Sequence, residues 1–417
     1  MSSAHGLRAI TRALAQPNFG IYVAGNAVSL VGTWMQRIAV GWLTWQLTGS
    51  GAWLGIVAFA DLFPSIFVGP FGGAVADRRN PLRVVAAAQS CAMVIAALLF
   101  VLTATGAIGP YVLAGVVFMN GVVIGFNQPS RLALVPSLVR TEDLSTAVAI
   151  NSIIFNLARF VGPAVAGVLI ATFGVASAFA VNAATFLVFL LALTRVRLPA
   201  EPAGPARLPG GSVLDDIGEG VRYTVAHPGI GPLLLLLTVT AIAIRPFIEL
   251  LPGFAADVFG RGATGLAILS STIGVGAVAG GLWLAQRGRA EGLTAVALGS
   301  TLALALSTIA FVATTSFWFA VAALAFAGVV LVVSGVASQT LLQLAVPKAM
   351  RGRVLSLFGI IFRGGPAVGA LVMGALSEWV GLRLPLFAGA LLTAALWAWL
   401  WPRRARIAES LENPATE

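Results

Sequence analysis

The sequence has very few charged residues for its length. Charged side chains make up 10% of the 417 residues, whereas hydrophobic side chains make up 59%. A soluble globular domain needs about 25% charged residues to cover its surface, so this composition excludes a soluble protein. Because one membrane-spanning helix takes about 20 apolar residues, the chain has room for about a dozen spans joined by short loops.

Cysteine and histidine, two common metal-binding residues, are nearly absent. Cys91 is the single cysteine and lies in an apolar run, so we expect no intramolecular disulfide and no cysteine-based metal site. The two histidines, His5 and His227, lie in polar segments. This position argues against a histidine-based metal site or proton relay inside a membrane. We therefore expect neither a metal nor a cofactor.

One glycine-rich pattern resembles a nucleotide site but has the wrong context. Gly274-x-Gly276-x-x-Ala279 has the spacing of a dinucleotide-binding turn, which needs a strand before it and a helix after it. The pattern lies inside a long apolar segment, so we interpret it as a site of close helix packing. No phosphate-loop lysine motif is present, and we expect no transport driven by ATP.

Long apolar segments follow one another along the whole chain, and each is long enough to cross a bilayer as a helix. We predict twelve spans, near residues 19–46, 52–75, 83–104, 111–136, 144–171, 176–194, 229–256, 262–286, 292–313, 316–345, 353–377 and 382–401.

The basic residues are distributed unevenly between the two sets of loops. Loops after odd-numbered spans carry only Arg261 and Arg383, and nearly all other basic residues outside the spans lie in the opposite loops and the tails. Cytoplasmic loops are rich in Lys and Arg, so we predict that both termini are cytoplasmic. The arginine- and alanine-rich usage suggests a bacterial cytoplasmic (inner) membrane. Because the positive charges do not cluster on one face, we expect a lipid bilayer and no nucleic acid as partner.

A long polar stretch divides the predicted spans into two sets of six. We predict an N-terminal half at 1–194, a cytoplasmic linker with a surface helix at 195–228, a C-terminal half at 229–402 and a cytoplasmic tail at 403–417. Both halves begin on the same side of the membrane, which indicates a parallel repeat.

Weak internal repetition supports the two halves. Arg37 of the first span recurs as Arg245 of the seventh, and the arginine before a Gly-Pro pair in the fifth span, Arg159, recurs in the eleventh as Arg363. The fold class that we predict is an all-α integral membrane protein with twelve helices in two parallel six-helix halves.

Six ionisable residues lie deep inside the predicted spans, at least seven residues from either end: Arg37, Asp61, Arg159, Arg245, Glu249 and Arg363. A charge at the centre of a spanning helix costs about 2.5–3.5 kcal/mol to insert, so these side chains must face one another or a water-filled cavity. Asn127 and Arg131 belong to a polar stripe on the fourth span. We predict a shared substrate and proton pathway; the alternative is polar contacts that hold packed helices together.

The two carboxylates of this set have arginine neighbours. Arg37 and Asp61 lie at similar depths on consecutive spans, and Glu249 follows Arg245 by one helical turn. We therefore predict two ion pairs; alternatively, both pairs are inert struts. Asp61 and Glu249 are also the candidate proton carriers, because a change in burial or in the distance to an arginine changes the proton affinity of a carboxylate.

The sharpest local motif follows the second predicted span. The string Gly73-x-x-x-Asp77-Arg78-x-Asn80-x-x-Arg83 resembles the signature between spans 2 and 3 of the major facilitator superfamily, with Asn80 at a position where that family has glycine. We expect Gly73 to allow close helix approach and Asn80 to tolerate a left-handed turn. Asp77 is expected to latch one gate state through bonds to basic residues or to a helix N-terminus.

Further motifs narrow the resemblance. Gly162-Pro163-x-x-x-Gly167 in the fifth span is similar to the antiporter motif of the superfamily, in which proline kinks the helix and glycines permit close packing. The pattern around Ser29 in the first span looks like the branch that contains the enterobactin exporter and macrolide efflux pumps. The resemblance implies a major facilitator fold with a substrate site between the halves, which rock against each other.

These observations together predict a secondary active transporter, not an enzyme. We expect a monomeric, proton-coupled exporter of a small amphipathic or anionic organic molecule, such as a siderophore or an antibiotic, that works by alternating access. Four arginines against two carboxylates in the spans favour anionic over cationic cargo. The alternatives are a membrane-embedded enzyme, a channel, or an importer with the same fold.

Overall fold

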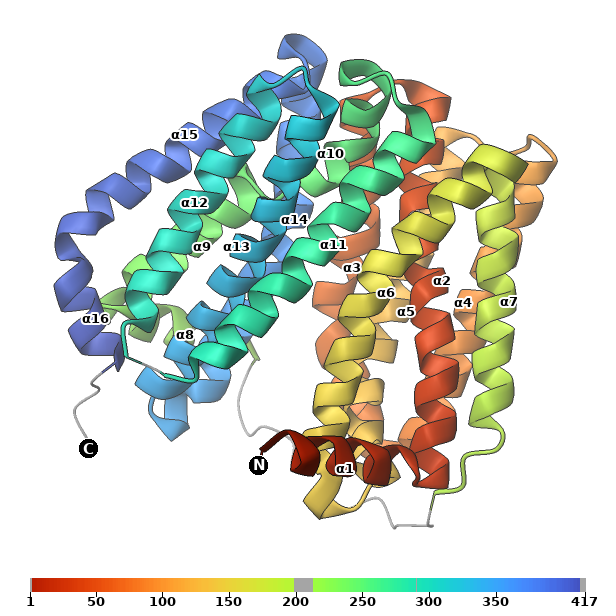
Figure 1. The fold of residues 1–417 in the computed structure, drawn as a ribbon, viewed down its shortest axis with the longest axis horizontal. Coiled ribbons are helices and arrows are strands. Elements are labelled where there is room, and N and C mark those ends of the chain that lie inside the picture. Colours follow the sequence, from red (N-terminus) through yellow and green to blue (C-terminus); the bar gives the residue numbers. More distant parts are fainter. Residues whose placement is uncertain (1, 199–212, 290, 413–417) are drawn as a thin grey trace. The chain divides into compact units, whose positions relative to one another are not determined.

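The computed structural model describes residues 2–198, 213–289 and 291–412, without the side chains of residues 2–7, 77 and 213–217. Every regular element in these residues is helical (Figure 1). The α-helices are α1 (Ser2–Leu14), α2 (Pro17–Thr48), α3 (Gly51–Arg78), α4 (Pro81–Ala104), α5 (Pro110–Leu134), α6 (Leu144–Phe173), α7 (Val175–Leu193), α8 (Val213–Ala226), α9 (Ile230–Ala243), α10 (Phe247–Gly253), α11 (Gly262–Arg287), α12 (Leu293–Ala313), α13 (Phe317–Ala345), α14 (Lys348–Val380), α15 (Arg383–Leu400) and α16 (Arg404–Glu412).

The long helices confirm the predicted class of an all-α membrane protein. Eleven helical segments of the described residues are long and apolar enough to cross a bilayer. The remaining predicted span corresponds to α2, which has 32 residues but is not among the eleven. Its inward-facing polar residues, among them Asn26, Ser29 and Gln36, lower its mean hydropathy.

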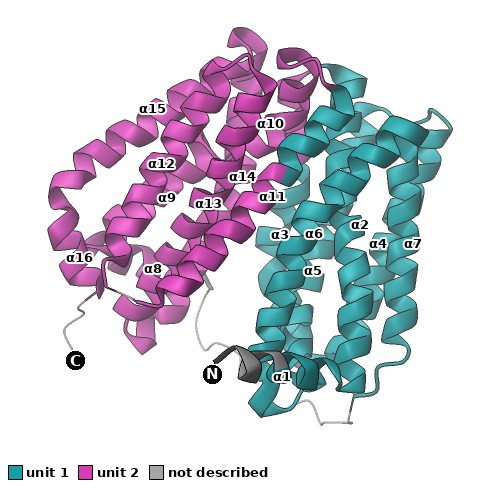
Figure 2. Ribbon diagram, in the orientation of Figure 1, with its two compact units in different colours: residues 1–49, 60–207, 262–271 teal, residues 50–59, 208–261, 272–417 magenta. Residues whose placement is uncertain are grey.

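The chain divides into two compact units (Figure 2). Unit 1 contains residues 1–49, 60–207 and 262–271, and unit 2 contains residues 50–59, 208–261 and 272–417. Each unit therefore includes a short piece of a helix that mostly belongs to the other. The domain boundaries that we drew from the sequence, at 194, 228 and 402, stay a prediction.

Small residues allow the helices of unit 1 to approach closely. A Cβ atom added at Gly32 of α2 would lie 2.1–2.2 Å from the side-chain oxygens of Thr185 and Asn182 on α7. Asn182 is fully buried there and donates a hydrogen bond of 2.7 Å to Gln36 Oε1. Because lipid tails do not drive helices together, such close packing and buried hydrogen bonds stabilise a membrane bundle.

Unit 2 uses the same principle at the glycine-rich pattern of α11. A Cβ atom at Gly276 would lie 1.9 Å from the carbonyl oxygen of Ala325 on α13, and Gly280 has the same relation to Val329 at 2.4 Å. These glycines are therefore a helix-packing site, as we predicted, and the close backbone contact leaves no room there for a nucleotide.

Three surface helices flank the bundles. Figure 1 shows α1 lying crosswise at one end of α2 in unit 1. In unit 2, α8 packs on the beginning of α14, and α16 packs on α12 and α13. The last described residue of α16, Glu412, accepts hydrogen bonds from the backbone N–H groups of Gly292 and Thr294, at 2.6 and 2.7 Å. It thus satisfies orphan donors at the N-terminus of α12.

Candidate functional site

The predicted seventh span is interrupted where Arg245 lies. Helix α9 ends at Ala243 and α10 begins at Phe247, followed by a π-helical turn at Phe254–Val258. Pro246 has no N–H to continue the hydrogen-bond ladder, and the N–H groups of Ile244 and Arg245 both donate to the carbonyl of Thr240. Irregular backbone at membrane depth is tolerated only inside protein or beside a water-filled cavity, so the break marks a candidate site.

The guanidinium of Arg245 is held by Phe362 of α14. Its Nη1 atom donates a hydrogen bond of 3.0 Å to the Phe362 carbonyl, and its Cζ atom lies 4.0 Å from the centre of the Phe362 ring. Phe362 in turn stacks on Phe358, with 5.5 Å between ring centres. The cation–π contact stabilises the positive charge of Arg245.

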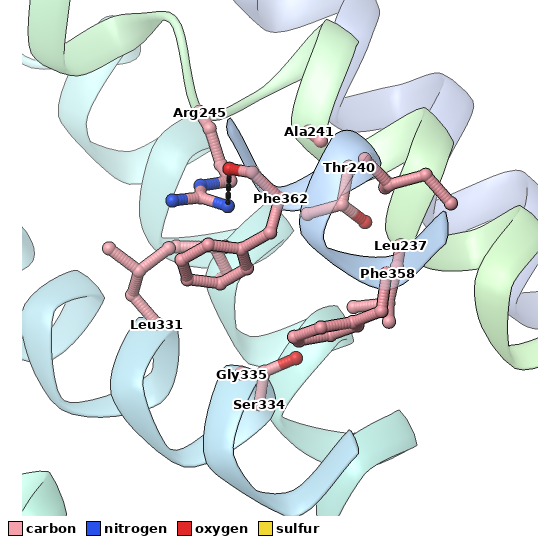
Figure 3. Close-up of a pocket in the computed structure, with 11 residues that line it drawn as sticks. Leu237, Thr240, Ala241, Arg245, Leu331, Ser334, Gly335, Phe358 and Phe362 are labelled. Carbon is pink, nitrogen blue, oxygen red and sulfur yellow. Dashed lines mark hydrogen bonds between the residues drawn. The ribbon is translucent and has the colours of Figure 1, made fainter. Parts of the chain in front are cut away.

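A pocket opens beside this contact, entirely within unit 2 (Figure 3). It encloses about 360 Å³ of empty space, part of which is open to solvent. Most of its lining is apolar, and the polar side chains in the lining are Arg245, Thr240 and Ser334. A concave, mostly apolar pocket with a few convergent polar groups is the usual form of a small-molecule site.

Two predicted arginines of unit 1 meet at one tryptophan. The Cζ atoms of Arg37 and Arg159 lie 5.7 and 5.5 Å from the ring centre of Trp34 on α2, and Phe155 contacts the same ring edge-on at 5.7 Å. The Trp34 ring therefore links α2 and α6. Trp34 was not singled out from the sequence, although it precedes Arg37 by three residues and so shares its helix face.

The polar stripe of α5 makes contacts at both of its ends. Asn120 donates a hydrogen bond of 3.3 Å to Asp61 Oδ1 on α3, and Arg131 donates to the buried Asn26 on α2. Between them, Asn127 Oδ1 is buried with no hydrogen-bond partner among the described residues. The stripe thus connects α5 to two neighbouring helices of unit 1.

The comparisons with known proteins decide the family. The sequence matches the family model described as transmembrane secretion effector over residues 11–414. The chain belongs to this major facilitator family. It is therefore a multi-pass membrane transporter of small molecules and not an enzyme.

Two curated relatives of this chain are transporters of siderophores. The enterobactin exporter EntS of Shigella boydii serotype 4 is 29% identical over 86% of this chain and 85% of its own length. The staphyloferrin A transporter of Staphylococcus aureus is 28% identical over 41% of this chain, and the match spans 43% of that relative.

Solved structures with low sequence identity share the fold. A bacterial homologue of the human lysosomal transporter Spinster, in an inward-facing and unoccupied conformation, gives a TM-score of 0.72 at 16% identity, over 95% of this chain and 98% of that one. A POT family transporter in complex with 5-aminolevulinic acid gives 0.74 at 11% identity, over 93% and 96%. This transporter thus has the major facilitator fold that we predicted.

The remaining predicted pathway residues of this transporter are separate from the pocket lining. Glu249 is half-buried in the first turn of α10, where a negative charge interacts favourably with the helix dipole. Arg363 is exposed on α14, next to Phe362. The ion pairs that we predicted for Arg37 with Asp61 and for Arg245 with Glu249 stay predictions.

The motif after the second span corrects two expectations. A Cβ atom at Gly73 would meet no described atom within 4 Å, whereas one at Gly72 would lie 2.4 Å from the carbonyl of Gly125 on α5. The close approach is therefore made at Gly72. Asn80 has a φ of −58°, outside the left-handed region, and its side chain instead caps α4 by accepting bonds from two backbone N–H groups.

The other residues of this motif stay untested as a gate. The side chain of Asp77 lies outside the part of the structure that is described, and Arg78 and Arg83 are exposed.

The Gly-Pro motif of α6 is a packing site within a continuous helix. A Cβ atom at Gly162 would lie 2.5 Å from Trp34 Cβ, and one at Gly167 would lie 2.3 Å from Ala267 Cβ on α11. Pro163 lies inside α6, which continues to Phe173. The motif thus lets α6 pack closely on α2 and on the first part of α11, residues 262–271, which belongs to unit 1.

A buried carboxylate that the sequence did not predict, Asp143, lies against the end of α1. Asp143 is fully buried just before α6 and accepts hydrogen bonds from the side chains of Arg12 and Gln16, including bonds of 2.8 Å to Arg12 Nε and Gln16 Nε2. The bonds and charge of Asp143 raise the pKa of Arg12 above its usual value. A clamp therefore fixes α1 to the start of α6.

Unit 2 has a corresponding clamp of opposite polarity. Glu219 on α8, the surface helix before α9, forms an ion pair of 3.2 Å with Arg353 near the start of α14. In unit 1 the surface helix supplies the cation, and in unit 2 it supplies the anion. No local sequence pattern signals either pair, because the partners lie more than a hundred residues apart.

Proposed function

We propose that this transporter exports a small anionic or amphipathic organic molecule of the siderophore type from the bacterial cytoplasm. The observation that carries the proposal is the excess of arginine over carboxylate deep in the predicted spans, where Arg37, Arg159, Arg245 and Arg363 outnumber Asp61 and Glu249. An excess of positive charge along a pathway favours an anion over a cation. The similarity to the enterobactin exporter over most of both chains supports the direction of transport and the cargo class.

We also propose that export is coupled to the proton gradient. Asp61 and Glu249 are the carboxylates deepest in the spans, and each lies beside groups whose distance can change during alternating access: Asn120 for Asp61, and the helix break for Glu249. The distribution of basic loops supports placing both termini in the cytoplasm. We propose that the protein works as a monomer in the inner membrane.

Transport in membrane vesicles tests the proposal. Inside-out vesicles containing the protein, with an acidic interior, should accumulate radiolabelled enterobactin or staphyloferrin A, and an uncoupler should abolish the accumulation. Vesicles without the protein are the control. Accumulation that requires right-side-out vesicles would indicate an importer, and non-saturable flux that never exceeds equilibrium would indicate a channel.

A further inference from the structure

Tryptophan and arginine are concentrated where the last long helix ends. Three of the ten tryptophans of the chain, Trp397, Trp399 and Trp401, lie within five residues, and Arg403 and Arg404 follow directly. Tryptophan is enriched where a membrane meets water, so this segment lies at the depth of the lipid headgroups. Figure 2 shows the junction of α15 and α16, which contains these residues, at the edge of unit 2.

Two of these tryptophans each hold one arginine. The Cζ atom of Arg403 lies 4.2 Å from the ring centre of Trp399, and the Cζ atom of Arg404 lies 4.4 Å from the ring centre of Trp401. The Nη1 atom of each arginine also donates a hydrogen bond to the backbone carbonyl of the same tryptophan, at 2.8 and 3.2 Å. The ring contact and the hydrogen bond together fix the position of each guanidinium.

Both guanidinium groups keep donors that can bind a ligand. The N–H donors of a guanidinium lie in its plane, so a ring that covers one face leaves the edge accessible. Arg403 and Arg404 are exposed, as is Arg406, and none of the three forms an ion pair with a described residue. On α16, Glu409 forms no such pair either, and Glu412 accepts the N–H groups at the start of α12. The arginines thus have no described counterion.

An exposed apolar stripe of α15 leads to these charges. Leu384, Leu391, Leu392 and Trp399 are 48–58% exposed, and spacings of seven or eight residues place them on one helix face. Leu392 lies about 10 Å before Trp399 along the helix axis, which is within the depth of one leaflet, about 15 Å. An apolar surface that ends in a cation at headgroup depth matches the form of a phospholipid.

We propose that the end of α15 binds an anionic phospholipid, one with a phosphate and no ammonium group in its head, such as phosphatidylglycerol. The phosphate accepts hydrogen bonds from Arg403 and Arg404, and an acyl chain lies along the stripe past Trp399 and Leu392. The occupant is a lipid because the charges continue an apolar face, and it is anionic because the arginine charges are uncompensated. This inference goes beyond the proposed function and depends on neither the cargo nor the direction of transport.

The corresponding helix of the first half lacks this combination and provides a matched control. Helix α7, the sixth predicted span, is also followed by two exposed arginines, Arg195 and Arg197, but no tryptophan lies at its end. Neither of these arginines lies over an aromatic ring of a described residue. The ends of α7 and α15 thus carry similar charge and differ in the aromatic surface that fixes it.

Lipid binding to the purified, full-length protein tests the proposal. The probes are phosphatidylglycerol and phosphatidylcholine with identical acyl chains, and glycerol 3-phosphate, which has the phosphate without the chains. Native mass spectrometry in detergent measures the dissociation constant of each. Phosphatidylglycerol should bind at least about tenfold more tightly than phosphatidylcholine, because each arginine near the surface contributes about fivefold toward an anionic lipid. Equal binding of the two lipids would overturn the proposal. Glycerol 3-phosphate that binds as tightly as phosphatidylglycerol would indicate a site for a free anion and would also overturn it.

Variants locate the lipid. Arg403→Gln combined with Arg404→Gln should weaken the binding of phosphatidylglycerol at least about tenfold, whereas Arg195→Gln combined with Arg197→Gln, which removes the same charge, should leave it nearly unchanged. Trp399→Leu keeps an apolar side chain but removes the ring beside Arg403, so it should weaken binding by about two- to fivefold. Equal loss in the two double variants would show that net charge alone attracts the lipid, and unchanged binding without Arg403 and Arg404 would likewise refute the site.

Discussion

Single arginine side chains inside the spans rest on aromatic rings. Arg37 and Arg159 share Trp34, and Arg245 lies over Phe362. A cation–π contact contributes about 0.5–2 kcal/mol, more when the contact excludes water. The sequence predicts opposite charges or water as the surroundings of these arginines, and aromatic rings are a third way to stabilise a buried guanidinium.

The proton-coupling role of Glu249 leads to the first prediction. Glu249→Gln mimics the protonated carboxyl group permanently, so uphill export should fall by about 5–150-fold, the range of a coupling free energy of 1–3 kcal/mol. Downhill exchange of substrate should survive, because it does not need proton release. The assay is counterflow in liposomes together with uphill uptake into inside-out vesicles.

The control for this change is Glu409→Gln, which alters an exposed acid on α16. Normal uphill export by Glu249→Gln would remove Glu249 from the coupling mechanism and leave Asp61 as the candidate.

The buried carboxylate of Asp143 leads to the second prediction. Asp143→Asn removes the charge and one acceptor that hold Arg12 and Gln16, so the free energy of unfolding should fall by about 1–3 kcal/mol. Glu142→Gln is the control, because its pair with Arg140 is exposed and 4.0 Å long, and should change stability by less than about 0.5 kcal/mol. Denaturant unfolding in detergent micelles measures both, and equal effects would contradict the clamp.

At this scale the sequence reveals neighbours only when they are local. Trp34 and Arg37 share a helix face by spacing alone. Phe362 follows Arg245 by 117 residues, and Asp143 follows Arg12 by 131. Hydropathy identifies which segments cross the membrane but does not specify which loops or faces meet, so these partners were not predictable.

Among the elements, the interrupted seventh span depends on close packing. The carbonyl of Ile242 lacks a donor at Pro246, and Gly369 of α14 packs directly against it: an added Cβ atom would lie 2.3 Å from that oxygen and 2.6 Å from Pro246. The absent side chain therefore lets α14 cover the exposed backbone of the break.

Gly369→Ala should therefore destabilise unit 2, by about 1–3 kcal/mol, the usual effect of overpacking. Gly359→Ala on the same helix is the matched control, because a Cβ atom there meets nothing described within 4 Å. Alanine is the better helix former by about 1 kcal/mol, so this variant should be neutral or more stable. Melting temperatures in lipid nanodiscs distinguish the two, and a stable Gly369→Ala protein would show that the helices adjust freely.

The beginning of α9 provides a prediction about pH. His227 Nδ1 accepts hydrogen bonds from the N–H groups of Gly229 and Ile230, at 3.1 and 3.2 Å, and burial lowers the pKa of His227 below its usual value. The unfolded chain then binds a proton more readily than the folded one, so stability is complete above the unfolded pKa of about 6.5. Stability should decline as the pH falls below that value.

Melting temperatures between pH 8 and pH 5 test this sign. His227→Gln should be less stable than the wild type at pH 8 and should show a smaller decline toward pH 5. An equal decline in both proteins would assign the pH dependence to other groups.

The elements themselves were largely predictable, and their interruption was only partly so. Apolar runs bounded by glycine, proline and charged residues located the long helices within a few residues. Pro246 and Pro252 were visible signals of an irregular seventh span, but proline also occurs inside continuous helices here, as Pro163 does in α6. The difference depends on tertiary contacts that accept the free carbonyl groups, which the sequence does not show.

For the whole molecule, the orientation in the membrane is the main open prediction. In a Cys91→Ala background, single cysteines at the exposed Thr315 and Gly381 should react with an impermeant maleimide added to intact cells, and one at the exposed Ser137 should react only after lysis. In intact cells, the cysteines at 315 and 381 should be labelled at least about tenfold faster than the one at 137, because a bilayer excludes the charged reagent. External labelling of Ser137 would reverse the topology derived from the basic loops.

The opposite polarity of the two surface-helix clamps has a consequence for biosynthesis. When α8 leaves the ribosome, α1 and the start of α6 have already been made. Glu219 in place of Arg12 would face the carboxylate of Asp143, and Arg12 in place of Glu219 would face Arg353. Each wrong docking brings two like charges close together, which is unfavourable. The opposite polarity of the two clamps thus disfavours docking of either surface helix on the wrong bundle while the polypeptide is being made.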